Sequence, residues 1–114
     1  MGEMQESIED FKKAFAVLAK GIPKAMGCFT NFMNATLVEG ALDKTKELIA
    51  LATAVTARCR YSIAYTSRKA SAGATKDEII EAAGVAVLMG GSLTLAYFAE
   101  VKKALDEFAP ETYV

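Results

Sequence analysis

The sequence predicts a single all-α domain of five to six helices. Apolar residues recur at spacings of three and four along most of the chain, and no segment shows sustained alternation of period two. Glycine and proline separate the periodic segments at intervals of helix length. The 114 residues are 53% hydrophobic and 24% charged, which suits one packed core and excludes a disordered chain.

The first helix is expected over residues 5–20. Ser7 is its N-cap or lies in its first turn, and Gly21 ends it. Its apolar stripe consists of Ile8, Phe11, Phe15 and Leu18.

The second helix is expected over residues 23–38. Pro23 suits its opening turn, and Gly40 is a stop signal. One apolar stripe consists of Met26, Phe29 and Met33, with Cys28, Phe32 and Ala35 beside it. Cys28 is therefore expected to be an ordinary core residue.

The third helix is expected over residues 43–57, capped by Asp43 or Thr45. Glu47 lies early in it, where the positive end of the helix favours a carboxylate. Residues 48–57 carry no charge on any face, and a helix that is apolar all round is buried on all sides. Together with the nearly uncharged stretch 84–99, this predicts a homo-oligomer of three or more chains.

The last three helices are expected over residues 59–72, from about 76 to 89, and over 92–108. Gly73 ends the first of them. The segment from Thr75 to Glu78 matches a capping box, which opens the next helix. Gly90-Gly91 then ends this helix. Ser92 can cap the last helix, and Pro110 closes the chain. The apolar side of this last helix consists of Leu95, Phe98, Val101, Leu105 and Phe108.

Composition excludes several classes of function. The net charge is −1, without the basic face that a nucleic-acid-binding protein needs. The longest uncharged stretch has 16 residues and contains Gly90-Gly91-Ser92, so we expect no membrane span. The N-terminus is acidic and polar, unlike a signal or transit peptide. The two cysteines are therefore expected to be free thiols in a reducing cytoplasm.

The chain contains no histidine, which removes the commonest general base and the commonest metal ligand. No carboxylate or cysteine cluster has the spacing of a metal site, and no glycine-rich phosphate-binding motif is present. We therefore expect neither a metal nor a cofactor.

Cys59 is the residue that most suggests chemistry. If a helix begins near it, the thiol lies at a helix N-terminus between Arg58 and Arg60, and both features lower a thiol pKa. Ser62, one turn further, could donate a hydrogen bond to the thiolate, and Thr66 lies on the same face. The alternative is a small buried cysteine that packs between helices.

Four segments, in unbroken order, resemble the carboxymuconolactone decarboxylase and alkylhydroperoxidase-D (AhpD-like) superfamily. They are Lys46–Ala52, Cys59-x-Tyr61-Ser62-x3-Thr66, Gly73–Ile79 and Leu88–Gly91. The resemblance covers residues 20–108 and implies an all-helical fold that assembles into trimers or hexamers. It also implies a peroxidase chemistry in which a C-x-x-C pair reduces hydroperoxides while a glutamate and a histidine relay protons.

The resemblance assigns the site position by position. Glu47 matches the family glutamate and Cys59 the first cysteine, whereas Ser62 takes the place of the second cysteine and Thr66 that of the histidine. Two parts of the relay are therefore absent, and no disulfide can form within the motif. Tyr61 lies inside the motif as a supporting residue.

Three functions remain open at this stage. The first is a thiol oxidoreductase or peroxidase with Cys59 as nucleophile, Glu47 as proton acceptor, an arginine that tunes the thiol, and an external small thiol or redoxin as reductant. The second is a lyase for a small organic acid, with Glu47 as base and an arginine that binds a carboxylate. The third is a non-catalytic oligomeric scaffold.

Glu47 is expected to be partly buried and paired with a polar group, because desolvation of a lone carboxylate is costly. The candidates for its partner are Arg58, Tyr61, Ser62, Thr66 and Arg68. In one straight helix, Glu47 and Cys59 would be about 18 Å apart. Only a break near Arg58 or a second subunit could shorten that distance.

Overall fold

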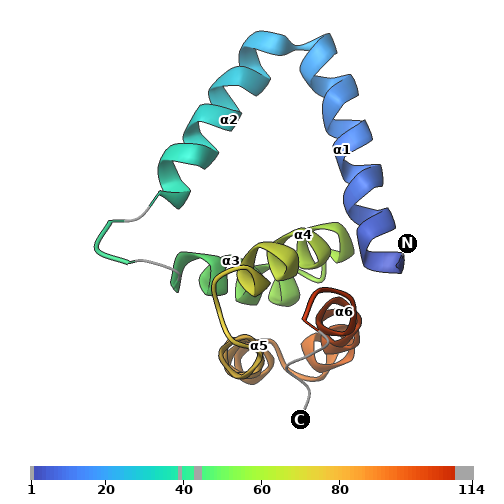
Figure 1. The fold of residues 1–114 in the computed structure, drawn as a ribbon, viewed down its shortest axis with the longest axis vertical. Coiled ribbons are helices and arrows are strands. Elements are labelled where there is room, and N and C mark those ends of the chain that lie inside the picture. The colour runs from blue at the N-terminus through green and yellow to red at the C-terminus, as the bar shows by residue number, and fades with distance from the viewer. Residues whose placement is uncertain (1, 39, 43–44, 110–114) are drawn as a thin grey trace.

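The computed structural model describes residues 2–38, 40–42 and 45–109, and within them the chain forms six helices and no strand. The predicted all-α fold is confirmed (Figure 1). The helices are α1 (Glu3–Gly21), α2 (Pro23–Leu37), α3 (Thr45–Ala57), α4 (Arg60–Ser71), α5 (Lys76–Gly90) and α6 (Ser92–Phe108). None of the helices in these ranges is both long and apolar enough to cross a membrane.

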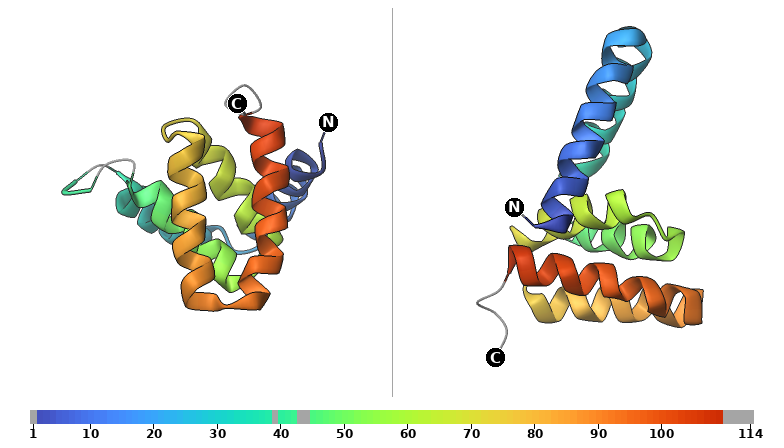
Figure 2. Two further views of the ribbon diagram at one scale, coloured as in Figure 1. Left: turned by 90° about the horizontal axis from the view of Figure 1, so that it is seen from below. Right: turned by 90° about the vertical axis from the view of Figure 1, so that its right-hand side faces the viewer.

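Four helices form a body of two layers (Figure 2). One layer contains α3 and α4, the other contains α5 and α6, and the layers meet where α3 packs on α5 and α4 on α6. Burial of apolar side chains between the layers supplies the main stabilising free energy. The largest fully buried apolar side chains are Met4, Ile8, Leu51, Ile63, Ile79, Leu105, Val55 and Val101.

The other two helices form a hairpin that projects from this body (Figures 1 and 2). Only the first turns of α1 are buried, and α2 has no buried residue. The predicted stripe of α1 is accordingly buried at Ile8, whereas Phe11 and Leu18 are exposed. Helical spacing marks an apolar face but does not tell what covers it.

Ion pairs fasten the base of the hairpin to the body. The guanidinium of Arg60 on α4 lies 2.6 Å from a carboxylate oxygen of Glu3 and 3.3 Å from one of Glu100 on α6. The ammonium of Lys103 lies 3.4 Å from Glu3 and 3.6 Å from Glu100. Two cations and two carboxylates thus join α1, α4 and α6, which makes the network more than an isolated surface pair.

The predicted capping box is confirmed at the start of α5. The backbone N–H of Glu78 donates to the hydroxyl of Thr75 at 3.1 Å, and the N–H of Thr75 donates to the Glu78 carboxylate at 2.8 Å. Two backbone donors that the helix leaves unpaired are therefore satisfied by two side chains.

The caps predicted at Ser7 and Ser92 are wrong. Ser7 lies inside α1, buried, and its hydroxyl donates to the Glu3 carbonyl at 3.1 Å. Ser92 is the first residue of α6, and the N-cap is Gly91, which has a φ of 79° and no side chain to cap with. Thr45 opens α3 as a helical residue, and Asp43 and Pro110 lie outside the described residues.

Arg58 separates α3 from α4 and has a φ of 58°, in the left-handed region that favours glycine. Its N–H donates to the Val55 carbonyl at 3.0 Å, and the N–H of Cys59 donates to the Ala54 carbonyl at 3.3 Å. These two bonds are those of a Schellman motif, which ends a helix with a sharp reversal. The break expected near Arg58 is therefore present.

Replacing Arg58 by glycine should leave the free energy of unfolding unchanged or raise it by about 1 kcal/mol, since glycine has no Cβ to clash at positive φ. Valine should lower it by about 1 kcal/mol or more, because a β-branched residue resists this conformation. Urea unfolding followed by circular dichroism measures both changes. Arg58→Ala is the matched control: it removes the guanidinium but keeps the Cβ. An equal gain with alanine and glycine would contradict backbone strain as the cause.

Candidate functional site

Cys59 lies where α3 has ended and α4 begins, as the N-cap residue of α4. Its carbonyl accepts the N–H of Ile63 at 2.8 Å, and its side chain is half-buried. The pKa of the Cys59 thiol is lowered below its ordinary value, first by a hydrogen bond from the Ser62 hydroxyl and then by the backbone N–H of Ser62. The N–H of Tyr61 adds to this, while partial burial acts in the opposite direction.

The lower pKa that the sequence suggested is thus present, and the helix N-terminus and Ser62 cause it as expected, whereas the two arginines do not. The Arg60 guanidinium faces Glu3 and Glu100, and Arg58 is exposed. Neither arginine contributes to the shift; hydrogen-bond donors at the helix start do. The thiolate is therefore stabilised by the exposed N–H groups of a helix N-terminus and one hydroxyl.

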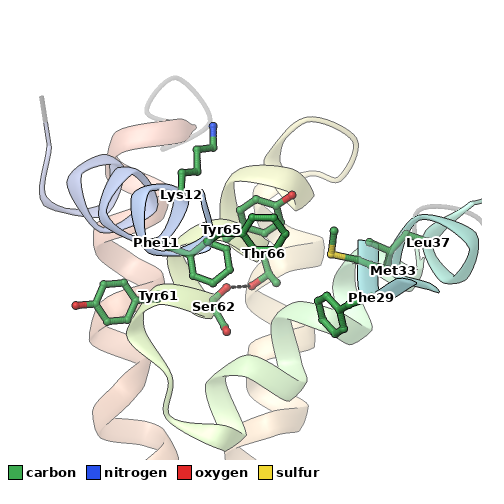
Figure 3. A pocket seen from close by; sticks show the side chains of 10 residues that line it. Phe11, Lys12, Phe29, Met33, Leu37, Tyr61, Ser62, Tyr65 and Thr66 are labelled. Atoms are coloured by element: carbon green, nitrogen blue, oxygen red, sulfur yellow. Dashed lines mark hydrogen bonds between the residues drawn. The ribbon is translucent and has the colours of Figure 1, made fainter. Parts of the chain in front are cut away.

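A cavity of about 380 Å³ lies between the hairpin and α4, beside Ser62 (Figure 3). Its lining is mostly apolar and aromatic, and the only basic residue among the described residues that form it is Lys12. Such a cavity favours an apolar molecule with few polar groups. It is lined by Phe11, Lys12 and Phe15 of α1, Phe29, Met33 and Leu37 of α2, and Tyr61, Ser62, Tyr65 and Thr66 of α4.

Ser62 connects the thiol to this cavity. Its side chain donates to Cys59 and also lines the cavity wall. Thr66 lies one turn further, and its hydroxyl donates to the Ser62 carbonyl at 2.7 Å, as Figure 3 shows. Because that proton is already in use, Thr66 offers an incoming molecule only a lone pair. Tyr61, which is exposed, completes this side of the wall.

The structure does not bring Glu47 to Cys59. Glu47 is half-buried in the first turn of α3, whereas Cys59 follows the end of that helix. The ten residues from Glu47 to Ala57 span about 15 Å along the axis. Among the described residues, no hydrogen bond or ion pair reaches the Glu47 carboxylate, so none of its five expected partners pairs with it. The reversal at Arg58 leaves the two residues at opposite ends of α3.

The expectation that Cys28 belongs to the core is wrong. It is exposed on α2, near Ile22 and Pro23 at the turn of the hairpin, and both cysteines are free thiols. Sequence reasoning also missed the part of the cavity wall that α1 and α2 provide. The sequence did carry a signal for this wall, because α2 is apolar on two faces. A helix that packs against one core needs only one apolar face.

Within the described ranges, no three side chains of histidine, cysteine, aspartate or glutamate converge as metal ligands would. The polar groups at the site include the Cys59 thiol, the hydroxyls of Ser62 and Thr66, and the ammonium of Lys12.

Comparisons with known proteins find one matching family model and two similar crystal structures. The model of the carboxymuconolactone decarboxylase family matches residues 23–104. A crystal structure of a protein of that family from Legionella pneumophila, in its apo form, has a TM-score of 0.89 and 38% identity, over 94% of this chain and 97% of that one.

A second crystal structure is of a family protein from Thermotoga maritima, for which an involvement in the antioxidative response has been suggested. It has a TM-score of 0.78 and 29% identity, over 90% of this chain and 88% of that one. No curated protein sequence matches the chain significantly.

Replacing Ser62 by alanine should raise the Cys59 pKa, because it removes the largest of the interactions that stabilise the thiolate. At neutral pH the thiolate fraction then falls, and the thiol reacts more slowly with a thiol reagent; well above the pKa the two rates converge. The rate against pH should be measured in a Cys28→Ser background, so that one thiol reports. Ser62→Thr, which keeps the hydroxyl, should behave as the parent. An unchanged midpoint in the alanine variant would contradict the assignment.

Proposed function

Because the chain belongs to the carboxymuconolactone decarboxylase family, we propose that it is a thiol oxidoreductase of the peroxidase type with Cys59 as its nucleophile. Ser62 stabilises the thiolate and also lines the cavity, and Thr66 contributes a lone pair to the cavity wall. The relative from Thermotoga maritima, with its suggested antioxidative role, supports the same class of reaction.

The observation that carries this proposal is the thiol of lowered pKa next to an apolar cavity. A thiolate is the nucleophilic form of cysteine, so a lowered pKa raises the reactive fraction at neutral pH. The apolar lining suits the organic part of a hydroperoxide.

In the proposed reaction the Cys59 thiolate attacks the terminal oxygen of the hydroperoxide. The sulfur–oxygen bond forms as the oxygen–oxygen bond breaks, which leaves a sulfenic acid on Cys59 and an alkoxide. The alkoxide takes a proton and leaves as the alcohol. Sulfur is oxidised by two electrons and the peroxide is reduced by two.

An external thiol then restores the enzyme, since Ser62 cannot form a disulfide. It attacks the sulfenic acid, water leaves, and a mixed disulfide forms; a second thiol reduces this to Cys59 and a free disulfide. Cys28 is assigned no part in this step, because it lies near the turn of the hairpin and Cys59 lies between α3 and α4.

The lyase alternative has less support from the site. A small organic acid with several carboxylates needs cationic partners, whereas Arg60 is occupied by two carboxylates and the described cavity lining offers only Lys12. The scaffold alternative needs no thiol chemistry, so the same experiment distinguishes it from a peroxidase.

The full chain should consume cumene hydroperoxide in the presence of a dithiol reductant. Cys59→Ser should reduce the rate to that of the mixture without protein, since a serine hydroxyl is not activated here. Cys28→Ser, the matched control, should keep the parental rate. Mass spectrometry after a peroxide pulse without reductant should find the added oxygen on Cys59. Absence of turnover and of oxidised Cys59 in the parent protein would favour the scaffold.

A further inference from the structure

The cavity beside Ser62 has one charged group in its described wall, the ammonium of Lys12 on α1. The other described residues of the wall are uncharged. Glu9 and Asp10 precede Lys12 on the same helix, but neither lines the cavity. The wall therefore carries a charge of +1 and no carboxylate, which favours a ligand with one negative charge over a neutral or cationic ligand.

The Lys12 ammonium is available to such a ligand. Within the part of the chain that the structure describes, it has no ion pair and no hydrogen bond, whereas the ammonium of Lys102 lies 2.7 Å from Asp106 and that of Lys103 lies 3.4 Å from Glu3. An ammonium has three donors and no acceptor. A carboxylate that reaches Lys12 therefore gains a charge-assisted hydrogen bond without displacing a protein partner.

A second ammonium adds to the positive potential near this wall. The Nζ of Lys69 lies 5.9 Å from the centroid of the Tyr65 ring, and the rings of Tyr65 and Phe11 have centroids 6.3 Å apart. Lys12 follows Phe11 in the sequence, so two cations flank the contact between these two rings. Lys69 does not itself line the cavity, which leaves Lys12 as the group that a bound anion meets.

The polar groups of the wall lie apart from one another. Figure 3 shows the Lys12 ammonium pointing away from Ser62, with the ring of Phe11 between them. The hydroxyls of Ser62 and Thr66 mark the other polar region, next to the thiol. A ligand that uses both regions must therefore carry its two polar groups at opposite ends of an apolar body.

The size and composition of the cavity restrict that apolar body. The volume of about 380 Å³ is near the lower end of the roughly 300–1,000 Å³ that is typical of ligand cavities, which suits a small molecule. Aromatic rings pack favourably against other rings. The rings of this wall belong to Phe11, Phe15, Phe29, Tyr61 and Tyr65. The lining therefore favours an aromatic body.

We propose that the substrate is the hydroperoxide of an aromatic monocarboxylic acid. Its carboxylate binds Lys12, its ring occupies the cavity, and its peroxide group lies at Cys59 beside Ser62. This inference rests on the proposed function and leaves its electron balance unchanged: Cys59 takes the terminal oxygen, and the organic product is the corresponding hydroxy acid. Lys12 is then a specificity-determining residue that contacts the substrate away from the reacting oxygen atoms.

The para-carboxy derivative of cumene hydroperoxide and its methyl ester test this assignment, because the ester lacks the negative charge. With excess dithiol reductant, kcat/KM should be about fivefold higher for the acid than for the ester, the upper value for an ion pair at an exposed lysine. The difference should lie in KM, since the carboxylate is remote from the reacting atoms. Added salt should reduce the ratio of acid to ester, because it screens exposed charges.

Variants at two neighbouring lysines identify the group responsible. Lys12→Gln should bring the ratio of acid to ester to about one, Lys12→Arg should keep the preference, and Lys12→Glu should invert it. Lys13→Gln is the matched control, because Lys13 is the next residue on α1, is exposed and does not line the cavity. This control should keep the parental ratio. An equal loss of preference in Lys12→Gln and Lys13→Gln would contradict a contact at Lys12.

A binding measurement separates this inference from the proposed function. Calorimetry with the two product alcohols, the para-carboxy alcohol and its methyl ester, requires no turnover. The parent chain should bind the acid about fivefold more tightly than the ester, and Lys12→Gln should bind both equally. Turnover of cumene hydroperoxide without preference for the acid in turnover or binding would overturn the role of Lys12 and leave the peroxidase standing. Preferential binding of the acid without turnover of any hydroperoxide would support the carboxylate site and overturn the peroxidase.

Discussion

The chain reverses direction at Arg58 and Cys59, and the site depends on that reversal. Because Arg58 takes a positive φ, the two backbone bonds that end α3 can form and α4 can begin two residues later. Cys59 is therefore the last residue of the Schellman motif that ends α3 and also the N-cap residue of α4. Its thiol meets unpaired N–H groups of α4, and Ser62 comes within hydrogen-bond distance one turn further along. The lowered pKa of the Cys59 thiol therefore depends on this backbone geometry as well as on the Ser62 hydroxyl.

The ion pairs at Arg60 serve a different purpose from the one that sequence proximity suggested. An arginine beside a cysteine could stabilise a thiolate, but this guanidinium lies 2.6 Å from Glu3 and 3.3 Å from Glu100. It ties the base of α1 to α4 and α6, and so sets where the hairpin leaves the body (Figure 2). Since α1 and α2 provide much of the cavity wall, Arg60 positions that wall. Ser62 is the residue that stabilises the thiolate.

The two faces of the hairpin have different surroundings. Its inner face lines the cavity beside Ser62, and its outer face has no cover within the described residues of one chain. The cavity wall that α2 provides is joined to the body by few contacts, among them the two hydrogen bonds from Lys46 to the Thr36 and Val38 carbonyls.

The sequence by itself determined the helices, the capping box from Thr75 to Glu78 and the start of a helix at Cys59, because these depend on interactions between residues three or four positions apart. Only the tertiary structure decided that Cys28 is exposed, that Arg60 faces Glu3, and that the cavity joins three helices. Each of these depends on which distant segment lies opposite, and helical periodicity marks an apolar face without identifying its neighbour. The separation of Glu47 from Cys59 likewise follows from where α3 reverses, a backbone conformation that an arginine rarely adopts.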